Sequence, residues 1–334
     1  MRRRDFLAGS LCVLGCACTV HAQSLETIGW LGSTASGGLD AAIAWFKRGL
    51  GEEYPKSDDV HIVYRWADGD YKKLPQLAAD LLRQTKVIVA SGGPASSLAA
   101  KQLTTRVPIV FTSVSDPVKT GLVTSLNKPG GNVTGIAALT RELDPKRLEL
   151  LSELVPRAKT IAVFVNPNRP DLSDQLTDIN SSAAKIGVSI EIVRAASEND
   201  LNNAFATLAN RPDVGAALFG ADPFFNSVRG PVVALCIRYG LPGIFQWREF
   251  VEAGGLASFG PNINDNYRMA GRYVGRILKG ERPGDLPVLQ PTKFEFVINA
   301  RTAKAFDLVL QPSLLARRRG DRMRRREFLA GLDA

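Results

Sequence analysis

Short apolar runs rich in β-branched residues alternate with amphipathic helical patterns along most of this chain, and this alternation is the strongest constraint on its fold. Helical patterns such as LDAAIAWFKRGL and YKKLPQLAADLLRQ separate the runs of the first half. Such alternation predicts an α/β fold, in which helices cover both faces of a mainly parallel sheet. The runs of the first half are bounded by turn residues, as buried strands are: LETIGWLGS (25–33), VHIVYRWA (60–67), KVIVASG (86–92), VPIVFTSV (107–114) and NVTGIAAL (132–139).

The same alternation starts again after residue 139. Asp144 followed by Pro145 predicts a helix that begins with Asp144 as its cap, and Ser197 with Asp200 forms a capping-box pattern. We therefore predict two doubly wound parallel-sheet lobes. The strand-like runs of the second series are TIAVFVNP (160–167), VSIEIVRA (188–195), VGAALFGA (214–221), PGIFQW (242–247) and LASFG (256–260).

One helical pattern and one strand pattern remain after the second series, at residues 266–280 and 294–299. If the two lobes exchange these segments, several crossovers join them and act as a hinge around a cleft. A chain of 334 residues also exceeds the size of about 250–300 residues at which single cores stop growing. The predicted fold is two doubly wound lobes joined by a multi-crossover hinge, and the predicted division is residues 23–139 plus 261–288 for lobe 1 and 140–260 plus 289–316 for lobe 2.

Residues 1–22 have the pattern of an export signal: an arginine cluster at residues 2–4, an apolar stretch through Val20, and Val-His-Ala ending at Ala22. We expect cleavage near Ala22 and a periplasmic location. Lipid attachment at Cys16, in a Val-Leu-Gly-Cys sequence, is the alternative. The twin-arginine and the general secretory routes are both compatible with this signal.

The segment MRRREFLAG (323–331) nearly repeats MRRRDFLAG (1–9). Too few residues follow it for an export signal, so we expect residues 317–334 to form a disordered basic tail that arose from a frameshift or a fused reading frame. A regulatory or nucleic-acid-binding arm is the alternative.

Charge and residue usage exclude several classes of function. The net charge is +9, of which residues 1–22 carry +2 and residues 317–334 carry +4, which leaves +3 for the body and argues against a nucleic-acid partner. Cleavage near Ala22 would leave Cys236, which we expect in the core, and His61 as the remaining cysteine and histidine. We therefore expect no disulfide, metal site or cofactor. The chain lacks the common catalytic and nucleotide-binding motifs, and Glu52-Glu53 falls in what we predict to be a polar loop, so we do not expect an enzyme.

The candidate binding residues lie at the carboxyl ends of the predicted strands, where ligands bind in open parallel sheets. Each loop alone resembles an ordinary strand-to-helix turn. Together, small and hydroxyl-bearing residues in the first half could bind an anionic group, and Asp222 with its aromatic neighbours suits a zwitterion with a flat or apolar side chain. The candidates are Ser33, Thr34, Ser36, Ser91, Gly92, Gly93, Pro94, Ser113, Ser115 and Asp116 in the first half, and Asn166, Asp222 and Trp247 in the second.

Several long segments resemble the substrate-binding proteins of ABC transporters, in the group that includes the tryptophan/tyrosine-type transporter components. The resemblance covers about residues 25–316 and implies a type I periplasmic binding protein that captures a small solute, possibly an amino acid, by closure of two lobes and delivers it to permease subunits in the inner membrane. It also implies that the serine-rich loops, through Ser115, bind a carboxylate and that Asp222 binds an amine. The segments are VPIVFTSVSDPVKTGLVTSLNKPGGNVTGI, PKRLELLSELVP, GADPFFNS, QWREFVEAGGLASFG, YVGRILKGERPGDLPVLQPTKFEFVIN and TAKAFDLVLQPSLLAR.

Two other functions stay open from the sequence: a sensory solute receptor, and a hydrolase or transferase on a two-lobed α/β scaffold. We expect a monomer.

Overall fold

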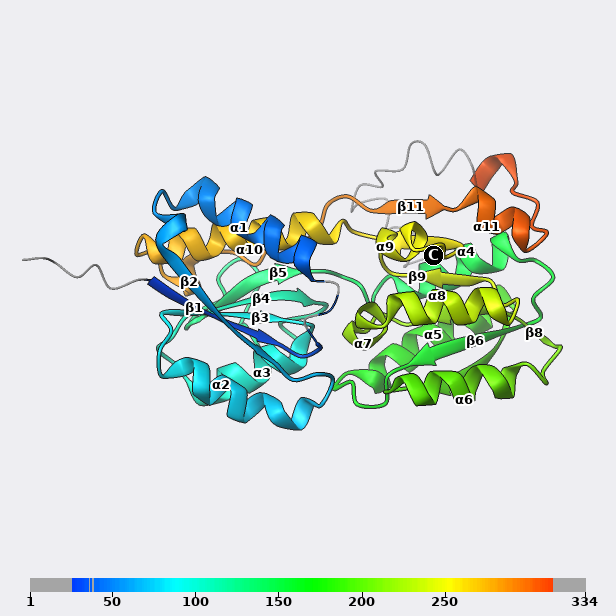
Figure 1. Ribbon diagram of the computed structural model, residues 1–334, viewed down its shortest axis with the longest axis horizontal. Helices are drawn as coiled ribbons and strands as arrows, with labels where there is room; N and C mark the ends of the chain where they lie inside the picture. Colours follow the sequence, from blue (N-terminus) through cyan, green and yellow to red (C-terminus); the bar gives the residue numbers. More distant parts are fainter. Residues whose placement is uncertain (1–25, 36, 38, 315–334) are drawn as a thin grey trace, which may run out of the picture.

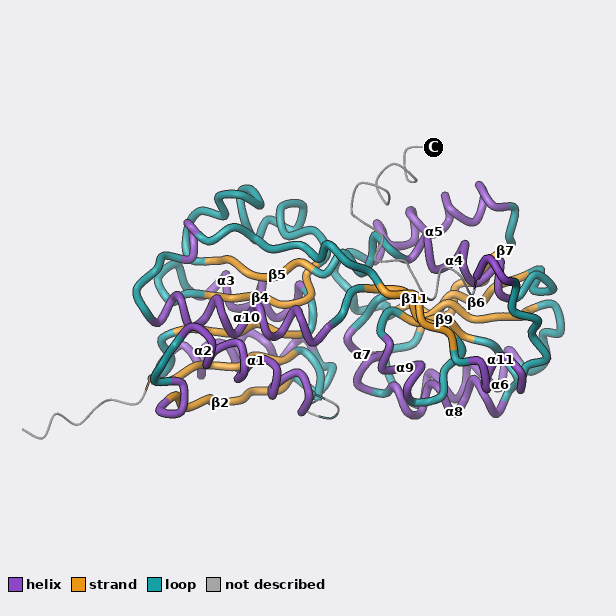
Figure 2. The backbone as a smooth tube through the Cα atoms, turned by 90° about the horizontal axis from the view of Figure 1, so that it is seen from above, coloured by secondary structure: helices purple, strands orange, loops and turns teal. Residues whose placement is uncertain are grey.

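The chain folds into two α/β halves placed side by side, and the polypeptide passes between them three times (Figures 1 and 2). The computed structural model describes residues 26–35, 37 and 39–314. The predicted export signal, the predicted basic tail and Ser36 lie outside the described residues. Among the helices of the described part, none combines the length and apolar character needed to cross a membrane.

The first half contains a five-stranded parallel sheet in the order β2-β1-β3-β4-β5. Each of its strands lies within one of the runs predicted from the sequence. These runs are continuously apolar because both faces of the sheet are covered: the side chain of Trp30 packs on one face and that of Leu31 on the other, and both are fully buried. The strands are β1 (Glu26–Gly32), β2 (Val60–Trp66), β3 (Val87–Ser91), β4 (Ile109–Val114) and β5 (Val133–Ala137).

Helices cover both faces of this sheet, as Figure 1 shows. One face carries α1 and α10, and the other carries α2 and α3. Short 3₁₀ turns connect some of these elements. The helices are α1 (Asp40–Glu53), α2 (Leu74–Leu82), α3 (Pro94–Leu103) and α10 (Ile263–Leu278), and the 3₁₀ turns are η1 (Ser57–Asp59), η2 (Tyr71–Lys73) and η3 (Pro283–Asp285).

The second half contains a six-stranded sheet in the order β11-β10-β9-β8-β6-β7, in which only β11 runs antiparallel to its neighbour. Helices again cover both faces, so the predicted fold class is confirmed. The strands are β6 (Thr160–Val165), β7 (Ser189–Arg194), β8 (Val214–Phe219), β9 (Gly243–Phe245), β10 (Ala257–Gly260) and β11 (Glu295–Ile298); the helices are α4 (Asp144–Leu154), α5 (Leu172–Ile186), α6 (Glu198–Leu208), α7 (Pro223–Ser227), α8 (Arg229–Arg238), α9 (Arg248–Glu252) and α11 (Ala300–Ala305).

Helix α10 follows a strand of the second sheet but packs against α1 in the first half, where the two helices lie side by side in both overall views (Figures 1 and 2). Their backbones approach closely at glycines: a Cβ atom on Gly271 would lie 2.0 Å from the carbonyl oxygen of Phe46. Glu52 and Glu53 were expected in a polar loop, and that expectation is wrong. They end α1 and form ion pairs with Arg268 and Arg272 of α10, which strengthen the same contact.

After α10 the chain runs along β5 and then returns to the second sheet. Leu289 forms a parallel bridge with Ile136, and β11 then pairs with β10. The first half therefore contains α10, a segment that follows the second half in the sequence. The exact lobe boundaries stay a prediction.

A buried ion pair lies where two of the crossings meet. The expectation that Asp144 caps α4 is wrong: α4 begins at Asp144, and the carboxylate of Asp144 binds Arg147 and accepts a hydrogen bond of 2.7 Å from Gln175. Arg147 is fully buried and donates to the carbonyl oxygens of Thr140 (2.9 Å) and Phe259 (2.7 Å). One side chain thus ties the first crossing, which contains Thr140, to the strand that leads into the second.

Candidate functional site

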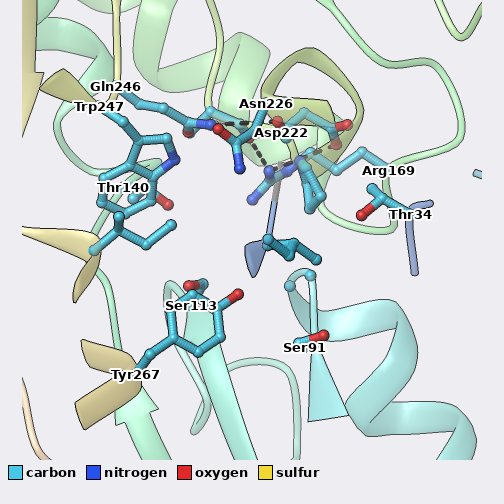
Figure 3. A pocket seen from close by; sticks show the side chains of 16 residues that line it. Thr34, Ser91, Ser113, Thr140, Arg169, Asp222, Asn226, Gln246, Trp247 and Tyr267 are labelled. Atoms are coloured by element: carbon cyan, nitrogen blue, oxygen red, sulfur yellow. Dashed lines mark hydrogen bonds and ion pairs between the residues drawn. The ribbon is translucent and has the colours of Figure 1, made fainter. Parts of the chain in front are cut away.

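A cavity lies between the two halves, at the carboxyl ends of their parallel strands (Figure 3). It encloses about 500 Å³ that protein atoms do not fill, part of which is open to solvent. The lining residues are Thr34, Leu39, Ser91, Gly92, Gly93, Ser113, Thr140, Arg169, Ala221, Asp222, Pro223, Asn226, Gln246, Trp247, Ile263 and Tyr267.

A tight turn in the first half directs the start of helix α3 toward the cavity. Gly92 and Gly93 both have φ of +84°, a conformation that glycine adopts without a steric penalty. A Cβ atom on Gly92 would lie 2.1 Å from the hydroxyl oxygen of Ser33, which itself donates a hydrogen bond of 2.7 Å to the carbonyl oxygen of Gly92. The N-terminal end of a helix carries partial positive charge and free N–H groups, so this wall favours an anion.

Two hydroxyl groups on the same wall are available to a ligand. The side-chain oxygens of Ser91 and Ser113 are buried and have no hydrogen-bond partner among the described residues. Buried polar atoms nearly always have such a partner. Ser113 also has φ of +59°, a strained conformation that for residues other than glycine is concentrated at functional sites. A ligand in the cavity could satisfy both hydroxyl groups.

Asp222 supplies the carboxylate of the opposite wall. Its Oδ1 atom accepts hydrogen bonds of 2.9 Å from the side-chain amide of Asn166 and 2.9 Å from the backbone N–H of Phe224, which fixes its orientation at the start of α7. Burial raises the pKa of the Asp222 carboxyl above its ordinary value, although Arg169 and the two hydrogen bonds oppose that shift.

Arg169 faces the cavity beside Asp222, and our sequence analysis did not select it. Its Nη1 atom lies 3.9 Å from Oδ2 of Asp222, while its Nε atom lies 2.6 Å from Oδ1 of Asp171. Burial by itself lowers the pKa of the Arg169 guanidinium, but the carboxylates of Asp171 and Asp222 outweigh burial and hold that pKa above its ordinary value. Arg169 follows β6 closely, three residues after Asn166, so the rule that selected Asn166 could have found it.

Aromatic and amide side chains complete the cavity. Trp247, at the start of α9, and Tyr267, on α10, approach from opposite sides, with Gln246 beside Trp247 and Asn226 beside Asp222 (Figure 3). Tyr267 stacks on Trp30, with ring centroids 5.8 Å apart, and burial raises its pKa to about 12. The cavity is therefore partly aromatic, and Tyr267 comes from the segment that returns to the first half.

The structure divides the described candidates from the sequence into two groups. Those that line the cavity are Thr34, Ser91, Gly92, Gly93, Ser113, Asp222 and Trp247. Those that do not line it are Ser33, Pro94, Ser115, Asp116 and Asn166. Within the second group, Ser115 accepts a hydrogen bond from the backbone N–H of Arg141, and Asp116 accepts two from its own turn.

Among the described residues, no group of three or more histidine, cysteine, aspartate or glutamate side chains is arranged to hold a metal ion. Cys236 is buried in the core, as expected, and His61 is exposed on β2. The chemistry that this site offers is charge, hydrogen bonding and aromatic contact.

The chain is similar in sequence and in fold to several known proteins. A family model described as "ABC transporter substrate binding protein" matches residues 34–320. A curated relative, the tyrosine-binding protein of Clostridioides difficile, is 30% identical over 271 residues, which cover 81% of this chain and 77% of the relative.

Similar solved structures include a conserved domain protein from Vibrio cholerae (TM-score 0.79, 26% identity, 88% of this chain and 98% of that one). An ABC domain from Streptococcus pneumoniae in complex with L-Trp has a TM-score of 0.78 at 26% identity, over 88% of this chain and 98% of that one. The ligand-free, open structure of an adhesive substrate-binding protein from Clostridium difficile has a TM-score of 0.60 at 27% identity, over 86% of this chain and 96% of that one.

Proposed function

This chain belongs to the ABC transporter substrate-binding protein family, and we propose that its cavity captures an α-amino acid with an aromatic or other apolar side chain. The chain has the type I periplasmic-binding-protein fold. The family consists of extracytoplasmic binding proteins rather than enzymes; they bind small-molecule solutes and work with ABC permease subunits.

The observation that carries the proposal is the presence, in one cavity, of an anion-binding wall opposite a carboxylate. The start of α3 and the free hydroxyl groups of Ser91 and Ser113 suit the ligand carboxylate, and Asp222 suits its ammonium group. Trp247 and Tyr267 offer aromatic contact to the ligand side chain. The similarity to a tyrosine-binding protein and to an L-Trp complex supports the same ligand class.

Capture by hinge closure is the second part of the proposal. Residues 23–139 plus 261–288 form one lobe and residues 140–260 plus 289–316 the other; the packing of α10 on α1 and the pairing of β11 with β10 support this division. The chain superposes better on the L-Trp complex than on the open, ligand-free relative at nearly equal identity, which supports a closed arrangement here.

The finer details of location and partners are also proposals. The mature protein starts after Ala22, acts in the periplasm as a monomer, does not bind nucleic acid, and releases its ligand chemically unchanged.

Native mass spectrometry of the purified protein, followed by thermal-shift screening with L-tryptophan, L-tyrosine and branched-chain amino acids, tests this proposal. A ligand at 100 times its Kd should stabilise the folded protein by about 2.7 kcal/mol. The double variant Ser91→Ala, Ser113→Ala should bind at least about tenfold more weakly, because two hydrogen bonds to a carboxylate are lost.

The matched control is Ser189→Ala, an exposed serine at the start of β7, far from the cavity, which should bind as the wild type does. Failure of every amino acid to bind, or chemical conversion of a bound one, would contradict the proposed function.

A further inference from the structure

We propose that Asp171, which does not line the cavity, determines the preference of the cavity for ligands that carry an ammonium group, because it holds the guanidinium of Arg169 away from Asp222. This inference rests on the proposed function, in which Asp222 binds the ammonium group of an amino acid. Asp171 is thus a positioning residue that acts through Arg169.

Arg169 faces two carboxylates but is hydrogen-bonded to one of them. Its Nη2 atom donates to Oδ2 of Asp171 at 3.0 Å, and its Nε atom lies 2.6 Å from Oδ1 of the same carboxylate. The Nη2 contact is a charge-assisted hydrogen bond and the Nε contact adds a close ion pair, while Nη1 donates to the carbonyl oxygen of Ala221. The distance of 3.9 Å from Nη1 to Oδ2 of Asp222 is too long for a hydrogen bond. Oδ2 of Asp222 therefore remains free to accept one from a ligand.

The position of Asp171 in the fold shows that its carboxylate is committed to this pairing. Asp171 is the N-cap residue of α5, where an aspartate normally accepts a hydrogen bond from the N–H groups of the helix. Here its side chain makes no cap hydrogen bond. The side chain instead turns toward Arg169, and Arg141 approaches it with Nε at 3.5 Å from Oδ2.

The loss of this carboxylate would leave Arg169 buried with an unbalanced charge. Such a charge is strongly unfavourable, and the nearest remaining carboxylate is that of Asp222. A short movement of the guanidinium, away from Asp171 and from the Ala221 carbonyl oxygen that Nη1 now binds, would form a hydrogen bond with Asp222. Asp222 would then have less negative charge and fewer free acceptor sites for a ligand ammonium, whereas a ligand carboxylate at the start of α3 would be little affected.

The test compares two probes that differ by the ammonium group alone: L-tryptophan and 3-(indol-3-yl)propanoate, its deaminated analogue. Calorimetric Kd values for both give a selectivity ratio for each variant of the full-length protein. In Asp171→Asn we expect this ratio to fall at least about tenfold, the value of one charge-assisted hydrogen bond. Asp171→Ser should give the same fall. Asparagine and serine are both preferred N-cap residues, so both variants should keep the start of α5.

Two controls separate positioning from simple loss of charge. Asp178→Asn removes a carboxylate of the same cluster, which lies 2.7 Å from Nη1 of Arg141 and does not contact Arg169, so the ratio should stay within about twofold of the wild type. Asp171→Glu retains the carboxylate and should recover most of the ratio.

An unchanged selectivity ratio in Asp171→Asn and Asp171→Ser, or an equal fall of this ratio in Asp178→Asn, would overturn the inference about Asp171. The proposed function would still stand in that case, provided that the wild type binds L-tryptophan. If calorimetry on the wild type detects no binding of L-tryptophan, L-tyrosine and its own deaminated analogue replace the two probes. If the wild type binds neither amino acid, both proposals fail.

Discussion

Asp222 places a carboxylate where almost no water reaches it, since only 3% of the residue is exposed. Burial favours the neutral form and raises the pKa of this carboxyl, although Arg169 opposes the shift. A carboxyl whose pKa is raised in the folded state contributes stability below its ordinary pKa, and this contribution is lost as the pH rises through the folded-state value. Ionisation of Asp222 is therefore a cost to the free protein, and a ligand ammonium would offset that cost.

We predict that affinity for an amino acid falls as the pH is lowered, with a midpoint above the ordinary aspartate pKa of about 3.9, because protonated Asp222 cannot balance an ammonium charge. Asp222→Asn should bind at least about tenfold more weakly at pH 7 and lose this pH dependence. It should be no less stable than the wild type without ligand, since asparagine also caps a helix well. Calorimetry between pH 4.5 and pH 8 measures both effects. Equal pH profiles for the two proteins would contradict the assignment of Asp222.

For single residues, the rule that ligands bind at the carboxyl ends of parallel strands predicted where the cavity lies but not which side chains face it. Asn166 stands in a correctly chosen loop, yet its side chain turns to Asp222 and does not line the cavity. Tyr267 could not be selected in this way because it is on a helix that reaches the cavity through tertiary packing. Local patterns indicate loop positions, whereas side-chain direction depends on contacts that only the folded chain forms.

At the scale of elements, every predicted strand is present, because burial of both sheet faces leaves a continuous apolar run in the sequence. The start of α4 was predicted less well. Asp144 has the residue type and position of a cap, but it is fully buried and binds Arg147 and Gln175. A pattern that describes exposed helix ends could not show that this end is buried between the two halves.

The close contact of α10 with α1 requires glycine where the two backbones meet, as at Gly271. We predict that Gly271→Ala destabilises the protein by about 1–3 kcal/mol or more, because its Cβ atom would meet the backbone of α1 at Phe46 and would push the helices apart. It should also weaken ligand binding, since α10 carries Tyr267 into the cavity. Urea denaturation and calorimetry measure the two effects.

Gly51→Ala is the control for that variant. Gly51 lies in α1 and is exposed, and its added Cβ atom would meet nothing closer than the Ser57 hydroxyl at 3.4 Å. Alanine in a helix is favoured over glycine by up to about 1 kcal/mol, so this variant should be as stable as the wild type or more stable. If both variants behave alike, close packing at Gly271 is not what holds α10 in place.

At the scale of the whole molecule, one ion pair joins the two halves beside the first crossing. Lys119, in the turn after β4, lies with Nζ 2.9 Å from Oδ2 of Asp174, in the first turn of α5. If the halves separate when the ligand leaves, this contact is made in the closed arrangement and lost in the open one.

We predict that Lys119→Glu shifts the ligand-free protein toward the open arrangement and weakens ligand binding by about two- to fivefold, since exposed ion pairs have small effects. The double variant Lys119→Glu, Asp174→Lys restores opposite charges and should recover the affinity. Lys86→Glu is a closely matched control: Lys86 has the same side-chain exposure as Lys119, 57%, and pairs at 2.8 Å with Glu26 inside the first half. Solution scattering without ligand, and calorimetry at low and high salt, measure the change. An affinity that is unaltered in the single variant, or that stays low in the double variant, would show that this pair does not favour closure.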